Sequence, residues 1–200
     1  MDDIQEIFDK AYDLSDKISK DLKELEELIW KNYQLPIDAK IDFPQGVLRR
    51  AENIRICLPF INDGVLKTNL SYHLMLADFY DWFLNRFGIS LTGQEMLIKE
   101  SICLYGNICA AVFKDVVSKN KKVKECIKSL FEQGIINENL KNNLEWLWDI
   151  RNKEHIEGLE EWEFKKYSLD DYKRASDTWK LLMGSLLSSN PRSKGVTDGQ

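Results

Sequence analysis

The residue types best suited to chemistry in this chain lie close together in its final third. His155, one of only two histidines, follows Arg151 by four positions and Asn152 by three. If the preceding helix continues that far, Arg151 and His155 lie on one helical stripe with Trp148. An arginine can bind a phosphate, and histidine is the side chain whose unperturbed charge changes between pH 5 and 8. The spacing therefore predicts a site that binds phosphate and transfers a proton.

The same residues resemble a known signature. Arg151-Asn152 followed by His155 is similar to the motif of the HEPN superfamily, a group of all-helical domains found in nucleases, toxins and nucleotidyltransferase partners. In that family four to six residues separate the arginine from the histidine, whereas three separate them here. A final amphipathic helix that opens near Tyr167 is also similar to the family. The resemblance covers residues 137–188.

This resemblance implies a metal-independent endoribonuclease of the toxin or defence type, which leaves a cyclic phosphate. Arg151 would hold the scissile phosphate, His155 would transfer the proton, and Asn152 would orient the phosphate or the histidine. It also implies RNA as the substrate and a homodimer in which two copies of the motif meet. A cognate antitoxin or a nucleotidyltransferase is the implied protein partner, and no cofactor is expected.

Each of these residues also has a purely structural explanation. Arg151 can pair with Asp149 or Glu154 near a helix C-terminus, where a cation is favoured. His155 can cap the same helix end, and asparagine at position 152 is a common helix-ending residue. The side chains themselves therefore leave both interpretations open.

The competing function is a non-catalytic helical module that binds a protein partner or oligomerises. Residues 3–31 place apolar side chains three or four positions apart, with charged residues between them, which is typical of a long amphipathic helix. The apolar residues from 4 to 29 would supply the seam of such an assembly. Catalysis instead requires Arg151 and His155 to be accessible in one cleft.

Other candidate residues carry weaker signals. Lys121, Lys122 and Lys124 lie in a basic stretch between two predicted helices, where they could contact RNA phosphates. Such runs are more commonly solvated faces. His73 has no Cys, His or carboxylate at a metal-ligand spacing, so we expect a core or surface histidine and predict no metal site.

Composition limits the remaining classes of protein. The chain has 200 residues, 44% hydrophobic and 30% charged, which is enough for one domain with a core. A net charge of −5 argues against indiscriminate binding to nucleic acid. No apolar run reaches eighteen residues and the first residues are acidic and polar, so we expect a cytoplasmic protein without a signal peptide or contact with a membrane.

The periodicity of apolar residues predicts a single all-α domain, a HEPN-like bundle of about seven helices, over residues 1–188. The third, fourth, sixth and seventh helices are expected to form its core. Residues 45–58 are predicted to form a short helix, and residues 189–200 a flexible tail. Thr92 and Ser168 each begin the spacing of a capping box and are expected to start helices.

Overall fold

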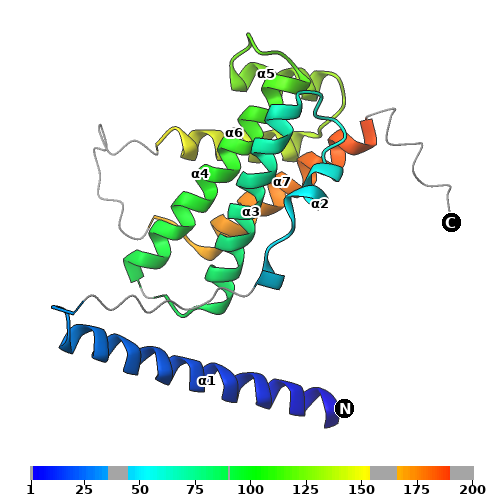
Figure 1. Ribbon diagram of the computed structural model, residues 1–200. Helices are drawn as coiled ribbons and strands as arrows, with labels where there is room; N and C mark the ends of the chain where they lie inside the picture. The colour runs from blue at the N-terminus through cyan, green and yellow to red at the C-terminus, as the bar shows by residue number, and fades with distance from the viewer. Residues whose placement is uncertain (1, 36–44, 90, 154–165, 190–200) are drawn as a thin grey trace. The chain divides into compact units, whose positions relative to one another are not determined.

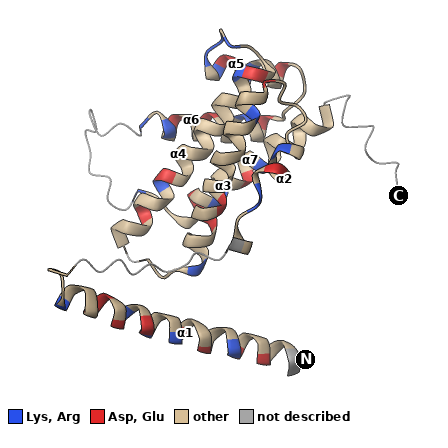
Figure 2. Ribbon diagram, viewed as in Figure 1, with Lys and Arg blue, Asp and Glu red and all other residues tan. Residues whose placement is uncertain are grey.

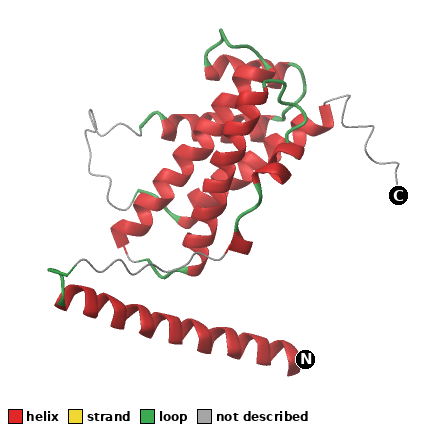
Figure 3. Cartoon of the chain, in the orientation of Figure 1, coloured by secondary structure: helices red, strands yellow, loops and turns green. Residues whose placement is uncertain are grey.

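The computed structural model describes residues 2–35, 45–89, 91–153 and 166–189. All regular structure within these ranges is helical (Figures 1 and 3), which confirms the all-α prediction of about seven helices there. The elements are α1 (Asp2–Lys31), the short 3-10 helix η1 (Gln45–Val47), α2 (Ala51–Ile56), α3 (Gly64–Arg86), α4 (Leu91–Val116), α5 (Val123–Glu132), α6 (Glu138–Arg151) and α7 (Leu169–Ser189).

The chain divides into two compact units, Met1–Pro44 and Gln45–Gln200. The single domain predicted over residues 1–188 is not tested by this division and stays a prediction. Helix α7 runs to Ser189, so the first residue of the predicted tail belongs to a helix. The remainder of that tail lies outside the described residues.

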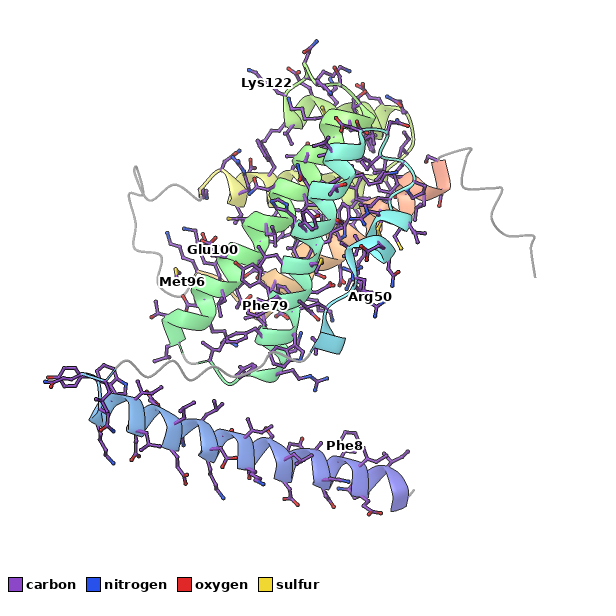
Figure 4. All side chains as sticks on the ribbon, in the orientation of Figure 1. Phe8, Arg50, Phe79, Met96, Glu100 and Lys122 are labelled. Atoms are coloured by element: carbon purple, nitrogen blue, oxygen red, sulfur yellow. The ribbon has the colours of Figure 1, made fainter. Side chains whose placement is uncertain are left out.

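Helix α1 supplies the regular structure of the N-terminal unit and confirms the amphipathic helix predicted over residues 3–31. Charged residues recur along its whole length (Figure 2). Its large apolar side chains, among them Ile4, Phe8 and Ile18, are exposed (Figure 4 labels Phe8). The helix therefore carries an apolar stripe that is still open to solvent.

The second unit is built around α4, which packs against α3, α5, α6 and α7. No charged residue occurs between positions 101 and 113 of α4, so this part of the helix is uncharged in Figure 2. Side chains such as Ile102, Val112 and Phe113 are fully buried there. Because α4 touches α3, α6 and α7, and α6 touches α7, the predicted four-helix core is confirmed.

The apolar composition of α4 has a second consequence. Within the described residues, α4 is the one helix whose length and composition would allow it to cross a membrane, with a mean hydropathy of 1.4 over its best 18-residue window. In the structure 67% of that window is buried among the neighbouring helices. Its apolar side chains thus form the core of the unit.

Local signals set several helix ends. Asp63 caps α3 by accepting hydrogen bonds from two backbone amides, and Asn137 caps α6 by accepting one, from the amide of Leu140. The capping box at Ser168 is formed, since its backbone amide donates to Asp171 at 2.9 Å. The prediction for Thr92 is wrong by one residue, because α4 already begins at Leu91, whose φ of 51° lies in the left-handed region.

The short helix predicted over residues 45–58 is corrected to two separate turns, η1 and α2. The segment between them is held in an extended course by a contact to another helix. Arg49 donates to both carboxylate oxygens of Asp78 on α3, and its backbone amide donates to the same carboxylate at 3.2 Å. This tertiary contact replaces the continuous helix that the sequence pattern favours.

Candidate functional site

Arg151 is the last residue of α6, and the helix stops there. Asn152 is the C-cap, and its backbone amide donates to the Trp148 carbonyl oxygen at 3.0 Å. A single helical stripe through Arg151 and His155 required α6 to continue to position 155, and this condition is not met, because α6 ends at Arg151 and the chain turns at residues 152–153. His155 lies outside the described residues, so its pairing with Arg151 stays a prediction.

The helix-ending role considered for Asn152 is the one seen in the structure. Its backbone closes the last turn of α6, in the C-cap position. The orienting role in catalysis that the family resemblance implies for this residue stays a prediction.

Arg151 is positioned by the middle of α4. Its Nε donates to Oδ1 of Asn107 at 2.7 Å, across a contact between residues that are 44 positions apart. The stem of Arg151 lies against Gly106, where an added Cβ would come within 2.8 Å of the arginine Cβ. Glycine at position 106 therefore allows the two helices to approach closely enough for the Arg151–Asn107 hydrogen bond to form.

The electrostatic environment of Arg151 leaves its charge uncompensated within the described part of the chain. Its guanidinium lies 5.1 Å from the centre of the Trp148 ring, and its hydrogen-bond partner Asn107 is a neutral amide. The expected ion pair with Asp149 is not formed, because that carboxylate binds Lys124 at 2.7 Å instead. Pairing with Glu154 falls outside the described residues. Among the described residues, the guanidinium is thus held by a neutral amide and is not paired with a carboxylate.

Asn107 also borders a small cavity between α3 and α4. The cavity measures about 80 Å³, and its polar lining residues are Asn69, His73 and Asn107. His73 is exposed, as expected, and its Nδ1 lies 2.9 Å from the Asn69 carbonyl oxygen. His73 has no metal-ligand spacing in the sequence, and no local pattern connects it with Arg151. The connection through Asn107 is visible only when α3, α4 and α6 are assembled.

The three lysines proposed to contact RNA differ in their surroundings. Lys124 pairs with Asp149, which raises the pKa of its ammonium through that hydrogen bond. Lys122 precedes α5 (Figure 4), where its backbone amide donates to Glu125. The Lys121 carbonyl oxygen accepts from Lys114 at 2.6 Å. One of these three charges is therefore matched by a carboxylate, and RNA binding by the group stays a prediction.

The described residues contain no group of three His, Cys, Asp or Glu side chains that could hold a metal ion. Two carboxylates lie one turn apart on α3, where Asp78 binds Arg49 and Asp81 accepts a hydrogen bond from the Tyr172 hydroxyl at 2.5 Å. Burial, followed by this hydrogen bond, raises the pKa of Tyr172. Both carboxylates thus already serve protein donors.

The fixed arginine is accordingly the feature of the described chain that fits the predicted chemistry. It lies at the end of α6, four positions before His155 in the sequence, and no described carboxylate pairs with it. No protein-family model matches this chain, and neither a curated protein nor a solved structure matches it.

Proposed function

We propose that this chain is a HEPN-like protein that processes nucleic acid, as a metal-independent endoribonuclease with Arg151 as its phosphate-binding residue. The observation that carries the proposal is the neutral partner of this arginine. A structural arginine in a folded protein is commonly matched by a carboxylate, whereas Arg151 is oriented by the amide of Asn107. The full positive charge is then left for a substrate phosphate.

The proposed reaction uses the 2′-hydroxyl of RNA as the nucleophile. A base removes its proton, the oxygen attacks phosphorus, and the bond from phosphorus to the 5′-oxygen breaks as that oxygen is protonated. A 2′,3′-cyclic phosphate and a 5′-hydroxyl result. Arg151 stabilises the charge that develops on the phosphoryl oxygens, and His155 transfers one of the protons. In this proposal Asn152 assists, and RNA also contacts Lys121, Lys122 and Lys124.

The proposal extends to the surroundings in which the protein acts. We place it in the cytoplasm, as a homodimer that brings two copies of the motif together, under the control of an antitoxin or a nucleotidyltransferase partner. The homodimer and the controlling partner rest on the family resemblance of residues 137–188, and the cytoplasmic location rests on the composition of the sequence.

The experiment is cleavage of a mixed-sequence, single-stranded RNA by the purified protein in EDTA. EDTA inactivates contaminating nucleases that depend on metal. The variant Arg151→Ala/His155→Ala is purified in parallel, with Lys180→Ala as a control that removes a cation from a different helix. Cleavage by wild type and Lys180→Ala alone is the expected result. Equal cleavage by all three proteins, or no cleavage by any, counts against the proposal.

A second candidate function is oligomerisation through α1, and the exposed apolar stripe of that helix favours it. Ile4, Ile18 and Leu25 are separated by seven positions or a multiple of seven. Ile7, Leu14 and Leu28 repeat with the same period, three positions further along the helix. This repeat suits a helical partner. Sedimentation equilibrium of wild type and Ile18→Glu distinguishes the candidates, since loss of assembly without loss of cleavage assigns α1 to association only.

A further inference from the structure

Three helices converge on the side chain of Asn107. Its Oδ1 accepts the hydrogen bond from Arg151, because a guanidinium can only donate. The two hydrogens on Nδ2 therefore remain for another acceptor, since no hydrogen bond from Nδ2 is seen to any described residue. Asn107 also lines the cavity that His73 lines. The amide that binds the arginine of α6 therefore borders the same cavity as the histidine of α3.

The protonation of His73 follows from its backbone contact. The carbonyl oxygen of Asn69 can only accept a hydrogen bond, so Nδ1 of His73 carries a hydrogen. The opposite ring nitrogen, Nε2, is then the ring atom left to meet a ligand.

The size and lining of the cavity limit what it can hold. A volume of about 80 Å³ has room for only a few waters, at about 30 Å³ of liquid for each. That space suits a single tetrahedral oxyanion better than the ring of a nucleobase. The remaining lining residues are apolar, namely Leu66, Leu70, Ile108 and Ala111, and no described carboxylate lines the cavity.

We propose that this cavity is an oxyanion subsite in which His73 and Asn107 bind one phosphate group, while Arg151, which is not among the lining residues, orients Asn107. Asn107 donates from Nδ2, and His73, as an imidazolium, donates from Nε2. The inference rests on the proposed function only in identifying the phosphate as one of RNA. His73 is then a binding residue of the same site, supplied by a helix distant in sequence from Arg151.

The direct test observes the imidazole of His73 during a titration with inorganic phosphate. The chain has two histidines, so His155→Ala leaves a single set of imidazole signals in a ¹H–¹³C NMR spectrum. Sulfate is titrated at the same pH, to separate binding from a change in protonation. We expect saturable shifts of the His73 signal with both anions. Absence of a saturable shift overturns the proposal.

Variants then assign the anion to this cavity. Asn107→Ala, in the His155→Ala background, is expected to raise the dissociation constant for phosphate about tenfold or more, as for loss of a hydrogen bond to a charged group. Arg151→Ala in the same background is also expected to raise it, because Asn107 loses the partner that orients it. Lys180→Ala removes the same charge elsewhere and is expected to leave the constant unchanged. An equal effect of Lys180→Ala and Arg151→Ala would mean that net charge, not the subsite, attracts the anion.

A final experiment distinguishes failure of the phosphate subsite from failure of the proposed ribonuclease activity. A short oligonucleotide with 2′-deoxyribose cannot be cleaved through a 2′-hydroxyl, yet it carries the same phosphates. Saturable shifts of His73 with phosphate and with this oligonucleotide, but no cleavage of RNA, retain the subsite and refute the ribonuclease. Cleavage of RNA with a His73 signal that neither ligand moves refutes the subsite and retains the ribonuclease.

Discussion

Arg49 and Arg151 are both held by a side chain from another helix, yet their partners differ in charge. Arg49 donates from two nitrogens to the carboxylate of Asp78, with distances of 2.6–3.1 Å. The hydrogen bond to Asp78 raises the pKa of the Arg49 guanidinium. Arg151 donates through Nε to the neutral amide of Asn107. One arginine is neutralised as a structural clamp, and the other is oriented with its charge retained.

One cavity lies next to Arg49 and another next to Asn107, the partner of Arg151. The depression next to Arg49 measures about 590 Å³, and two arginines, Arg49 and Arg86, and two carboxylates, Asp78 and Asp81, line it. The cavity next to Asn107 measures about 80 Å³ and has no described carboxylate in its lining. The carboxylates of the larger depression offset its arginines, whereas the amides of the smaller cavity can donate to an anion without an opposing carboxylate. The partner of an arginine, more than the arginine itself, indicates its role.

The largest expected effect comes from giving Arg151 a carboxylate partner like that of Arg49. Asn107→Asp places a carboxylate next to Arg151 and neutralises the guanidinium. We expect cleavage of RNA to fall about 100-fold, the loss typical of removing one stabilising group from a transition state. Stability is expected to be retained, because an ion pair replaces the hydrogen bond. Cleavage rates and urea unfolding are measured on the same protein sample.

The reciprocal variant Asp78→Asn is the control for this experiment. It leaves Arg49 beside an amide and is expected to leave cleavage unchanged. If Asn107→Asp cleaves RNA as fast as wild type, the charge of Arg151 is not what the reaction uses.

The next effect concerns the close approach of α4 and α6. Gly106→Ala forces a Cβ to within 2.8 Å of the Arg151 Cβ and 3.1 Å of its Cγ. We expect the free energy of unfolding to fall by about 1–3 kcal/mol, as for overpacking of a core contact. Urea denaturation with a constant m-value checks this result.

A matched glycine provides the control for Gly106. Gly184 lies within α7, and an added Cβ there meets nothing within 4 Å. Gly184→Ala is expected to raise the free energy of unfolding by about 0.5–1 kcal/mol through its helix propensity. Stabilisation of both variants by the same amount would show that Gly106 is not needed for the approach of the two helices.

A smaller effect is expected from removing the ion pair between Arg49 and Asp78. Asp78→Asn replaces the carboxylate with a neutral amide, and the Arg49 side chain is 52% exposed. After allowance for solvent screening, we expect a loss of about 1 kcal/mol in the free energy of unfolding. The measurement is repeated in high salt, where the difference from wild type should shrink. A difference that grows with salt would contradict an electrostatic origin.

The smallest effect is expected where both partners are exposed. Lys124 and Asp149 form an ion pair with side chains 55% and 52% exposed. Lys124→Ala is therefore expected to give no measurable change in the midpoint of thermal unfolding. It is also expected to lower RNA binding if the lysines contact phosphates, which filter binding at several salt concentrations would reveal.

Much of the helical framework can be predicted from the sequence. Asn137 and Ser168 act through residues three positions away, so their capping roles depend on local chemistry alone. The end of α6 was harder to predict, since the stripe through Arg151 would allow the helix to continue. The separation of η1 from α2 was also missed, because it accompanies the contact between Arg49 and Asp78 on a distant helix.

The sequence by itself determined the helices, the uncharged centre of α4 and the presence of Arg151 near a helix end. Those features depend on periodicity and on neighbours within a few positions. Only the tertiary structure decided that Arg151 meets Asn107 and that His73 lines the same cavity as Asn107. Such partners are set by the packing of α3, α4 and α6, which bring together residues far apart in the chain, and no local pattern encodes that choice.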